Sequence, residues 1–130
     1  MKSIYLQLTK ASDLFKKIEL TDENEIAITT GCTYNDQTEL ILYLVQRDDS
    51  LILTDNGRTR TFMDKIFELT APDVIKNILA VSNYYGISTQ NKQLSLKIED
   101  MEESFTEGFL KMVFCIGILN TMKVFYTSEG

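Results

Sequence analysis

The amino-acid sequence predicts an α+β protein with a mainly antiparallel sheet and helices packed on one face of that sheet. Three observations support this fold class: apolar alternation typical of strands, apolar stripes at helical spacing, and a connection between two strands that is too short for parallel pairing. The 130 residues have the length of one domain, and we find no repeat, linker or low-complexity segment. We therefore expect a single domain over residues 1–130, with elements in the order α-βββ-αα-β-α.

The N-terminal part is expected to be helical. Apolar residues recur at roughly helical spacing from Ile4 to Ile18 with charged residues between them, so residues 1–20 are assigned to an N-terminal helix. The sequence TDENE then breaks this pattern. Residues 26–30 (IAITT) are rich in β-branched side chains, which favour a strand.

A tight hairpin is expected in the middle of the chain. Residues 40–45 (LILYLV) are apolar at every position, as in a central strand buried on both faces. The turn at residues 47–50 leads directly into a second apolar segment, residues 51–54. Because two strands joined so closely cannot be parallel, we expect them to form an antiparallel pair.

Two helices should follow this hairpin. Apolar residues at helical spacing within residues 62–69 indicate the first of them. The sequence TAPD at residues 70–73 combines a cap hydroxyl, an early proline and an acid, which predicts the start of the second helix. Gly86 is expected to end this helix in a left-handed conformation.

The last part of the chain predicts one strand and one long helix. Residues 94–98 alternate between apolar and polar side chains, which indicates a half-exposed strand at an edge of the sheet. Ser104 and Glu107 have the spacing of a capping box at the start of the final helix. Residues 127–130 are expected to be a frayed tail.

Composition excludes several kinds of chemistry. The chain has no histidine, which removes the commonest general base, the commonest metal ligand and every Ser-His or Cys-His pair. Cys32 and Cys115 are too few for a zinc site, and we expect both to be reduced. The sequence shows neither a signal peptide nor a membrane-spanning run. These features predict a cytoplasmic protein without a cofactor.

The balance of charge is acidic. A net charge of −6 argues against direct binding to a duplex, which requires a cationic surface. One segment contains several acids and no basic residue: Glu99, Asp100, Glu102, Glu103 and Glu107. Carboxylates are common at the start of a helix, where they interact favourably with the helix dipole. The alternative is an acidic surface that competes with nucleic acid for a basic protein partner.

All three arginines of the chain fall in one short span, at Arg47, Arg58 and Arg60. Arginine binds carboxylate or phosphate groups through two parallel hydrogen bonds, so a small anion site near the strand ends is one hypothesis. Turn formation and helix capping by Asp55 and Thr59 explain the same stretch in structural terms. Both interpretations stay open.

A second polar group, Asn35 and Asp36, precedes the central strand. If the strand ends bring Asp36 close to Asp55, the two carboxylates could bind magnesium or act as acid and base. Two solvated turn residues are the structural alternative. The candidate residues for binding a ligand or partner are Asn35, Asp36, Asp55, Arg58, Thr59 and Arg60. No residue is assigned to catalysis or to a metal.

Several of these motifs resemble a known bacterial and prophage family, the domain of unknown function eighteen-twenty-eight. That family has an I-x-T-P strand, an N-D pair, an L-T-D-D-G-x-T turn and a later Y-G-[VI]. Similar motifs occur here at residues 28–30, 35–36, 53–59 and 85–87. The resemblance covers residues 25–125.

Two positions depart from the family pattern, because Gly31 replaces an expected proline and Asn56 replaces an expected aspartate. The second departure weakens the case for a metal bound by paired acids in the turn. The family has no established activity. The resemblance implies a small protein of a bacterial host cell, encoded by a bacterium or a phage, sometimes near defence and mobile-element genes.

Three functions are therefore considered. The leading hypothesis is a non-enzymatic acidic module that binds a protein, modulating or inhibiting a defence protein of the host that handles nucleic acid. The alternative is a small ligand- or metal-binding domain, or an enzyme, with a polar site at the turns of Asp36, Asp55 and Arg58. The third is a homo-oligomer in which the strand at residues 94–98 pairs across a two-fold axis.

Overall fold

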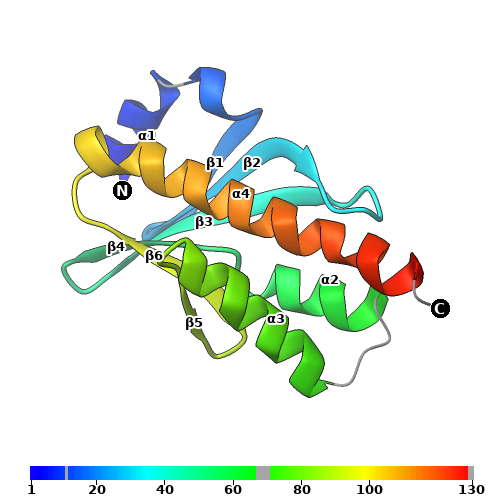
Figure 1. Ribbon diagram of the computed structural model, residues 1–130. Coiled ribbons are helices and arrows are strands. Elements are labelled where there is room, and N and C mark those ends of the chain that lie inside the picture. The colour runs from blue at the N-terminus through cyan, green and yellow to red at the C-terminus, as the bar shows by residue number, and fades with distance from the viewer. Residues whose placement is uncertain (11, 67–70, 129–130) are drawn as a thin grey trace.

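An antiparallel sheet of six strands is the frame of the structure, a computed structural model that describes residues 1–10, 12–66 and 71–128 (Figure 1). Within these ranges, the structure describes the side chains of all residues except 12, 65–66, 71–74 and 121–128. Across the sheet the strands run in the order β1 (Lys17–Asp22), β2 (Glu25–Thr33), β3 (Glu39–Arg47), β4 (Ser50–Thr54), β6 (Gln93–Ile98) and β5 (Ser88–Gln90). The predicted α+β class is confirmed.

The helices lie on one face of this sheet. They are α1 (Lys2–Thr9), α2 (Arg58–Ile66), α3 (Ala71–Tyr84) and α4 (Met101–Ser128), with a 3-10 turn at Ser12–Leu14. In Figure 1, α4 crosses in front of the strands and α3 lies beside it. None of the described helices is long and apolar enough to cross a membrane.

Alternation along the strands builds the core beneath the helices. In β2 and β3 every second side chain is buried, including Ile26, Ile28, Leu42 and Leu44. Leu53 of β4 is the cross-strand partner of Leu44 and continues the same layer. The helices contribute Leu8, Phe62, Met63, Ile78, Phe105, Phe109, Met112 and Leu119. One contiguous core therefore joins the sheet to all four helices.

The opposite face of the sheet, the open face, has no helix over it in the described part of the chain (Figure 1). The strand residues that alternate with the core positions point to this face. Several are apolar and half-buried: Ala27, Ile41, Tyr43, Val45 and Ile52. β3 is thus central within the sheet, as LILYLV predicts, but helices cover only one of its two apolar faces.

The predicted helix of residues 1–20 is wrong in its second half. α1 ends well before Ile18, which lies in β1 and pairs with β2. The helical spacing arises because two elements contribute to the core in succession. Leu8 is buried from α1, whereas Phe15 packs edge-to-face on Phe109 of α4 with ring centroids 6.1 Å apart.

The predicted edge position of the strand at residues 94–98 holds for only part of that strand. β6 lies between β4 and β5 at residues 93–95, whereas residues 96–98 pair with β4 alone in the described sheet. The outermost strand on this side, β5, consists of three polar residues without the apolar alternation of a strand. Its turn into β6 uses Asn91 and Lys92 at φ values of 52° and 62°, without the glycine that usually marks such a hairpin.

The end of α3 follows the prediction. Gly86 has a φ of 71°, and the N–H of Ile87 donates to the carbonyl of Ser82 at 2.9 Å. The predicted cap at Thr70, the last part of the stripe predicted at residues 62–69, and the final residues 129–130 lie outside the described residues.

Two glycines of α4 allow its packing to be tested. A Cβ at Gly108 would lie 2.8 Å from Ile98 Cδ1 and 3.1 Å from Leu96 Cδ2, whereas one at Gly117 would meet nothing within 4 Å. We expect Gly108→Leu to lower the free energy of unfolding by about 1–3 kcal/mol through overpacking. We expect Gly117→Ala to raise it by about 1 kcal/mol through helix propensity. Urea denaturation followed by circular dichroism measures both, and equal effects would contradict the packing of α4 on β6.

Candidate functional site

The LTDNGRT turn joins β4 to α2 and is organised around Asp55. Its carboxylate is fully buried, with 0% exposure. Oδ1 accepts hydrogen bonds from the backbone N–H groups of Gly57 at 2.9 Å and Leu94 at 3.0 Å, and Oδ2 accepts one from Thr59 at 3.2 Å. Two of these bonds hold the turn and the start of α2, and the third reaches β6. Asp55 therefore closes the turn and fastens it to the sheet.

The backbone of this turn explains the next two residues. Asn56 and Gly57 both have positive φ values, 55° and 80°. A Cβ at Gly57 would lie 3.2 Å from the carbonyl oxygen of Lys92, so glycine allows the turn to approach the β5–β6 connection. Asparagine tolerates the left-handed conformation, and its N–H donates to Thr54 Oγ1 at 3.2 Å. Asn56 thus has a conformational role.

Thr59 and Tyr34 link α2 to the β2–β3 connection. Their hydroxyl oxygens lie 3.0 Å apart, and the Tyr34 ring stacks on Phe62 with centroids 4.9 Å apart. Burial raises the pKa of Tyr34 to about 12; the hydrogen bond with Thr59 opposes this rise and the charge of Asp55 adds to it. Tyr34 is therefore a neutral packing group near neutral pH.

The Asn35-Asp36 pair fastens the β2–β3 connection to α4. The backbone N–H of Asn35 donates to Asn120 Oδ1 at 2.9 Å, and its Nδ2 donates to the Asn120 carbonyl at 2.6 Å. The Asn120 side chain in turn donates to the carbonyl of Thr33 at 3.3 Å. Asp36 Oδ1 accepts from the N–H of Thr38 at 2.9 Å, which closes an Asx turn. The contact between Asn35 and Asn120 joins residues 85 positions apart in the chain.

The three arginines have different surroundings in the structure. Arg60 Nε donates to both carboxylate oxygens of Asp64 at 3.1 Å, one helical turn further on. The guanidinium carbon of Arg58 lies 5.7 Å from the centroid of the Tyr43 ring, and Arg58 forms no ion pair within the described residues. Arg47 is exposed at the end of β3. Their closeness in sequence thus does not create one shared anion site.

The predicted site residues line two separate spaces. Asp36 and Arg58 line an open depression of about 270 Å³. Asp55, Thr59 and Arg60 line a second space of about 10 Å³, which has room for roughly one water molecule. No group of three or more metal-ligating side chains occurs among the described residues. Asp36 and Asp55 therefore face different spaces.

The acidic segment at residues 99–107 forms the start of α4, and part of it serves the fold. Asp100 Oδ1 accepts from the N–H of Glu102 at 2.8 Å. Ser104 Oγ accepts from the N–H of Asp100 at 3.0 Å and donates to its carbonyl at 2.7 Å. The predicted cap at Ser104 is wrong, because the helix begins one turn earlier and Asp100 caps it.

The remaining acids of this segment are exposed. Glu99 lies 3.9 Å from Lys97, and Glu107 lies 3.1 Å from Lys111. Exposed pairs of this kind stabilise a protein little. Two more acids, in the first turn of the helix, have no cation within ion-pair distance among the described residues: Glu102 and Glu103.

The outward face of α4 carries a feature that the sequence prediction missed. Leu110, Phe114 and Ile118, which we name the outer stripe, are exposed by 37%, 56% and 41%. Glu103 and Glu107 precede them on the same face, since all are three or four residues apart. A helix on a protein surface normally carries polar residues on this face. At these three positions α4 is instead apolar toward solvent, as it is toward the core.

A groove of about 410 Å³ runs beside the outer stripe, with Phe114, Gly117 and Ile118 in one wall and Cys32 in another. Cys32 is exposed and Cys115 is buried in the core, and both are free thiols, as predicted. Burial raises the pKa of the Cys115 thiol to about 12, and the charge of Asp55 acts in the same direction. Cys115 is thus an apolar packing residue.

Replacement of Asp55 tests its structural role. Asp55→Ala leaves three backbone N–H groups without an acceptor, so we expect the free energy of unfolding to fall by at least about 3 kcal/mol. Asp55→Asn keeps one acceptor oxygen and should cost less, about 1–3 kcal/mol. Urea denaturation measures both. Asp64→Ala, which removes only an exposed ion pair, serves as the control with an expected loss under about 1 kcal/mol. Equal losses for Asp55→Ala and Asp64→Ala would refute the role given to Asp55.

Ionisation of Tyr34 provides a second test. Since its pKa is raised from 10.0 to about 12, its contribution to stability is complete below pH 10 and is lost between pH 10 and 12. We expect Tyr34 to ionise near pH 12, and Tyr34→Phe to remove that step. Tyrosinate absorbance during alkaline titration measures it. Loss of a step near pH 10 instead would show that Tyr34 is not buried.

Comparison with known proteins adds no relative to this description. No family model, no curated protein and no solved structure matches the chain. The resemblance to the family named above stays a prediction based on its motifs.

Proposed function

We propose that the chain is a non-enzymatic module that binds a protein partner through the outward face of α4. The observation that carries this proposal is the outer stripe, which exposes three large apolar side chains at successive turns of one helix. Contiguous exposed apolar surface on a small protein is typical of an interaction site. Phe114 is the most exposed of the three and is the natural anchor.

The same face suggests the character of the partner. Glu107 and Glu103 lie one and two turns before Leu110, so the surface is acidic at one end and apolar at the other. A partner with an apolar groove and a basic rim would complement it. Basic rims are typical of proteins that bind nucleic acid, and this supports an inhibitor or modulator of a host nucleic-acid-handling protein.

A second candidate is a small-ligand site in the depression between Asp36 and Arg58. The favouring observation is Arg58, whose guanidinium has an aromatic ring and no carboxylate as its close neighbour in the described structure. Arg58 could pair with an anionic group of a ligand. The depression is open, and no other described cation lines it, so the outer stripe is the stronger candidate.

Capture from a host lysate with the tagged chain tests the proposal. We expect wild type to retain a defined protein partner, Phe114→Asp to lose it, and Glu103→Lys with Glu107→Lys to weaken it most at low salt. Leu6→Asp is the matched control, because Leu6 is an exposed apolar residue on another helix, α1, at 62% exposure. Quantitative mass spectrometry of the retained proteins is the measurement.

The outcomes separate the two candidates. Loss with Phe114→Asp and retention with Leu6→Asp support the outer stripe. Retention with Phe114→Asp and loss with Arg58→Ala would refute it and favour the depression between Asp36 and Arg58. Circular dichroism of each variant establishes that the fold is intact.

A further inference from the structure

The open face of the sheet carries an apolar surface, and Arg58 at the start of α2 reaches the Tyr43 ring at one end of it, with its guanidinium carbon 5.7 Å from the ring centroid. Ile41, Tyr43 and Val45 occupy successive positions of this face on β3. Ala27 of β2 is the cross-strand partner of Tyr43, and Ile52 of β4 is the partner of Val45. We name these five residues the open-face patch. An antiparallel sheet with one solvated face usually carries polar residues there, so such a patch indicates an interface.

One row of cross-strand partners runs through this patch. Glu25 of β2 pairs with Val45, Val45 pairs with Ile52, and Ile52 pairs with Lys97 of β6. Across four adjacent strands the row is therefore acidic, apolar, apolar and basic. A two-fold axis parallel to the strands, between β3 and β4, would place Glu25 of one copy opposite Lys97 of the other and Val45 opposite Ile52. The row is thus complementary to itself.

We propose that the open face is a dimer interface in which two copies of this chain pack sheet on sheet, with Glu25 opposite Lys97 on both sides of the apolar centre. A two-fold interface uses the same patch on both subunits, so it requires a row that complements itself. Sheets packed face to face lie about 10 Å apart with interdigitated side chains.

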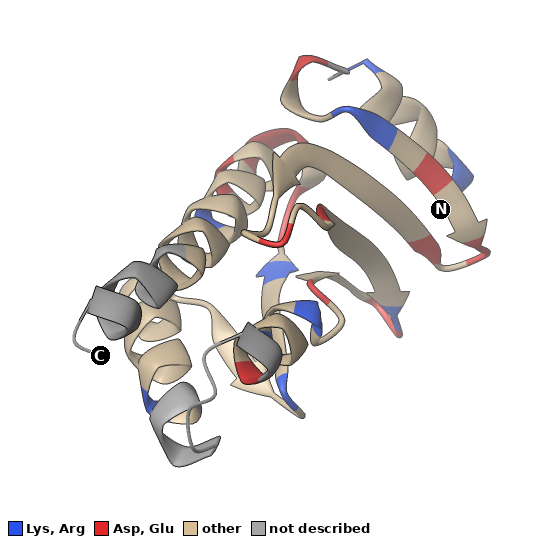
Figure 2. Cartoon of the chain, turned by 90° about the vertical axis from the view of Figure 1, so that its right-hand side faces the viewer, with Lys and Arg blue, Asp and Glu red and all other residues tan. Residues whose placement is uncertain are grey.

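The rim of the patch favours a second copy over a nucleic acid. β1 carries charges of both signs, Lys17 at its start followed by Glu19 and Asp22, rather than charges of one sign (Figure 2). Lys17 and Glu19 of that strand face the same side as Thr29 and Ala27, their partners on β2. A nucleic acid would require a uniformly basic face, whereas mixed charge suits a copy of the same surface.

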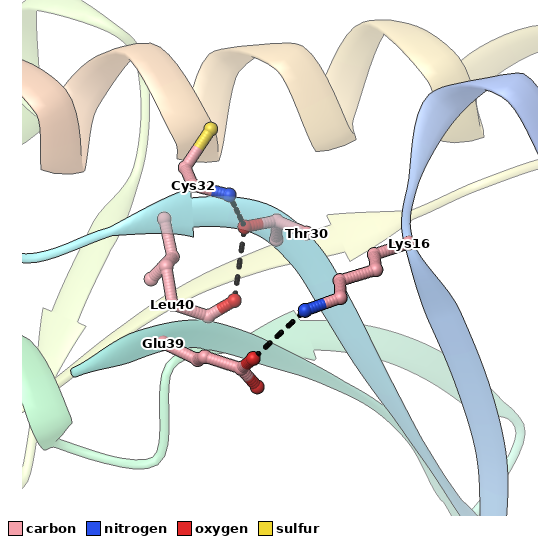
Figure 3. Close-up of polar contacts among 5 residues, drawn as sticks. All are labelled: Lys16, Thr30, Cys32, Glu39 and Leu40. Atoms are coloured by element: carbon pink, nitrogen blue, oxygen red, sulfur yellow. Dashed lines mark hydrogen bonds and ion pairs between the residues drawn. The ribbon is translucent and has the colours of Figure 1, made fainter. Parts of the chain in front are cut away.

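At one end of the open face, two charged side chains form an ion pair within the chain. Lys16 Nζ lies 3.1 Å from Glu39 Oε1, and this pair lies away from α4, whereas Leu40 and Cys32 point toward that helix (Figure 3). Glu39 is thereby neutralised at the edge of the patch. Within the row of cross-strand partners, the charges that two copies would place opposite each other are Glu25 and Lys97.

Both residues keep the capacity to pair with another chain. Lys97 Nζ lies 3.9 Å from Glu99 Oε1, a loose exposed contact. Glu25 Oε2 accepts from Thr21 Oγ1 at 2.7 Å, which leaves further lone pairs on the carboxylate. Ion pairs at a rim set register and specificity more than affinity.

The size of the face indicates a weak dimer. Six strands about 4.8 Å apart and about five residues long give a footprint on the order of 400 Å² per copy. A standard interface buries about 800 Å² per partner. We therefore expect a dimer that dissociates on dilution.

Analytical ultracentrifugation from low-micromolar to near-millimolar concentration tests the proposal. We expect wild type to convert from monomer to dimer in this range, and Ile52→Glu to weaken association at least about tenfold by placing a carboxylate against Val45. Phe114→Asp is the matched control on the opposite side of the molecule and should leave association unchanged. Because that side carries the outer stripe, failure of this inference leaves the proposed function intact.

Charge exchange tests the register independently of the apolar centre. Glu25→Lys and Lys97→Glu should each weaken the dimer, and the double variant should restore it, since every opposed pair is again of opposite sign. A wild type that is monomeric throughout the range, or a dimer that survives Ile52→Glu, would overturn the proposal. So would a double variant weaker than both single variants.

Discussion

The buried carboxylate of Asp55 is the interaction on which the arrangement of the structure depends. A charge without solvent is costly unless hydrogen bonds surround it, and here three backbone N–H groups supply them. Those donors belong to the turn after β4, the start of α2 and β6, so one side chain fixes three elements relative to one another. The position of α2 then carries Phe62 and Met63 into the core shared with α4. The stacked Tyr34 and its hydrogen bond to Thr59 extend the same joint to the β2–β3 connection.

The residue types of this joint are also those of a binding site, which is why the sequence could locate it without assigning its role. Asp, Asn, Gly, Arg and Thr in a short turn suit anion binding and helix capping equally well. The deciding contact is the bond from the Leu94 N–H, 39 residues away in the chain. A donor so distant, placed by the pairing of β4 with β6, leaves no local signal. The hydrogen bonds between Asn35 and Asn120 could not be predicted from the sequence for the same reason.

Much of the fold follows from local pattern, and the departures have identifiable causes. The hairpin of β3 and β4, the end of α3 at Gly86 and the inward stripe of α4 were predictable because each has a strong local pattern or turn signal. β1 was missed because its two partly buried apolar residues, Ile18 and Leu20, continue the spacing of the preceding helix. β5 was missed because it is short and polar. The outer stripe was hidden because a helix that is apolar on both sides shows little amphipathic contrast in sequence.

Two segments have more apolar residues than the chain's own core uses, and they lie on opposite sides of the molecule. LILYLV is apolar on both faces of a strand that helices cover on one, and α4 is apolar outward as well as inward. If two copies associate through the open face, their α4 helices lie at the two outer sides of the dimer.

Such a dimer is bivalent. A partner that is itself dimeric could bind the outer stripes of both copies, with an avidity greater than the affinity for a single stripe. Self-association and partner binding would then reinforce each other without sharing a residue. Ile52→Glu should therefore weaken capture of a dimeric partner without touching the surface that contacts it, whereas a monomeric partner should be captured equally well by wild type and by that variant.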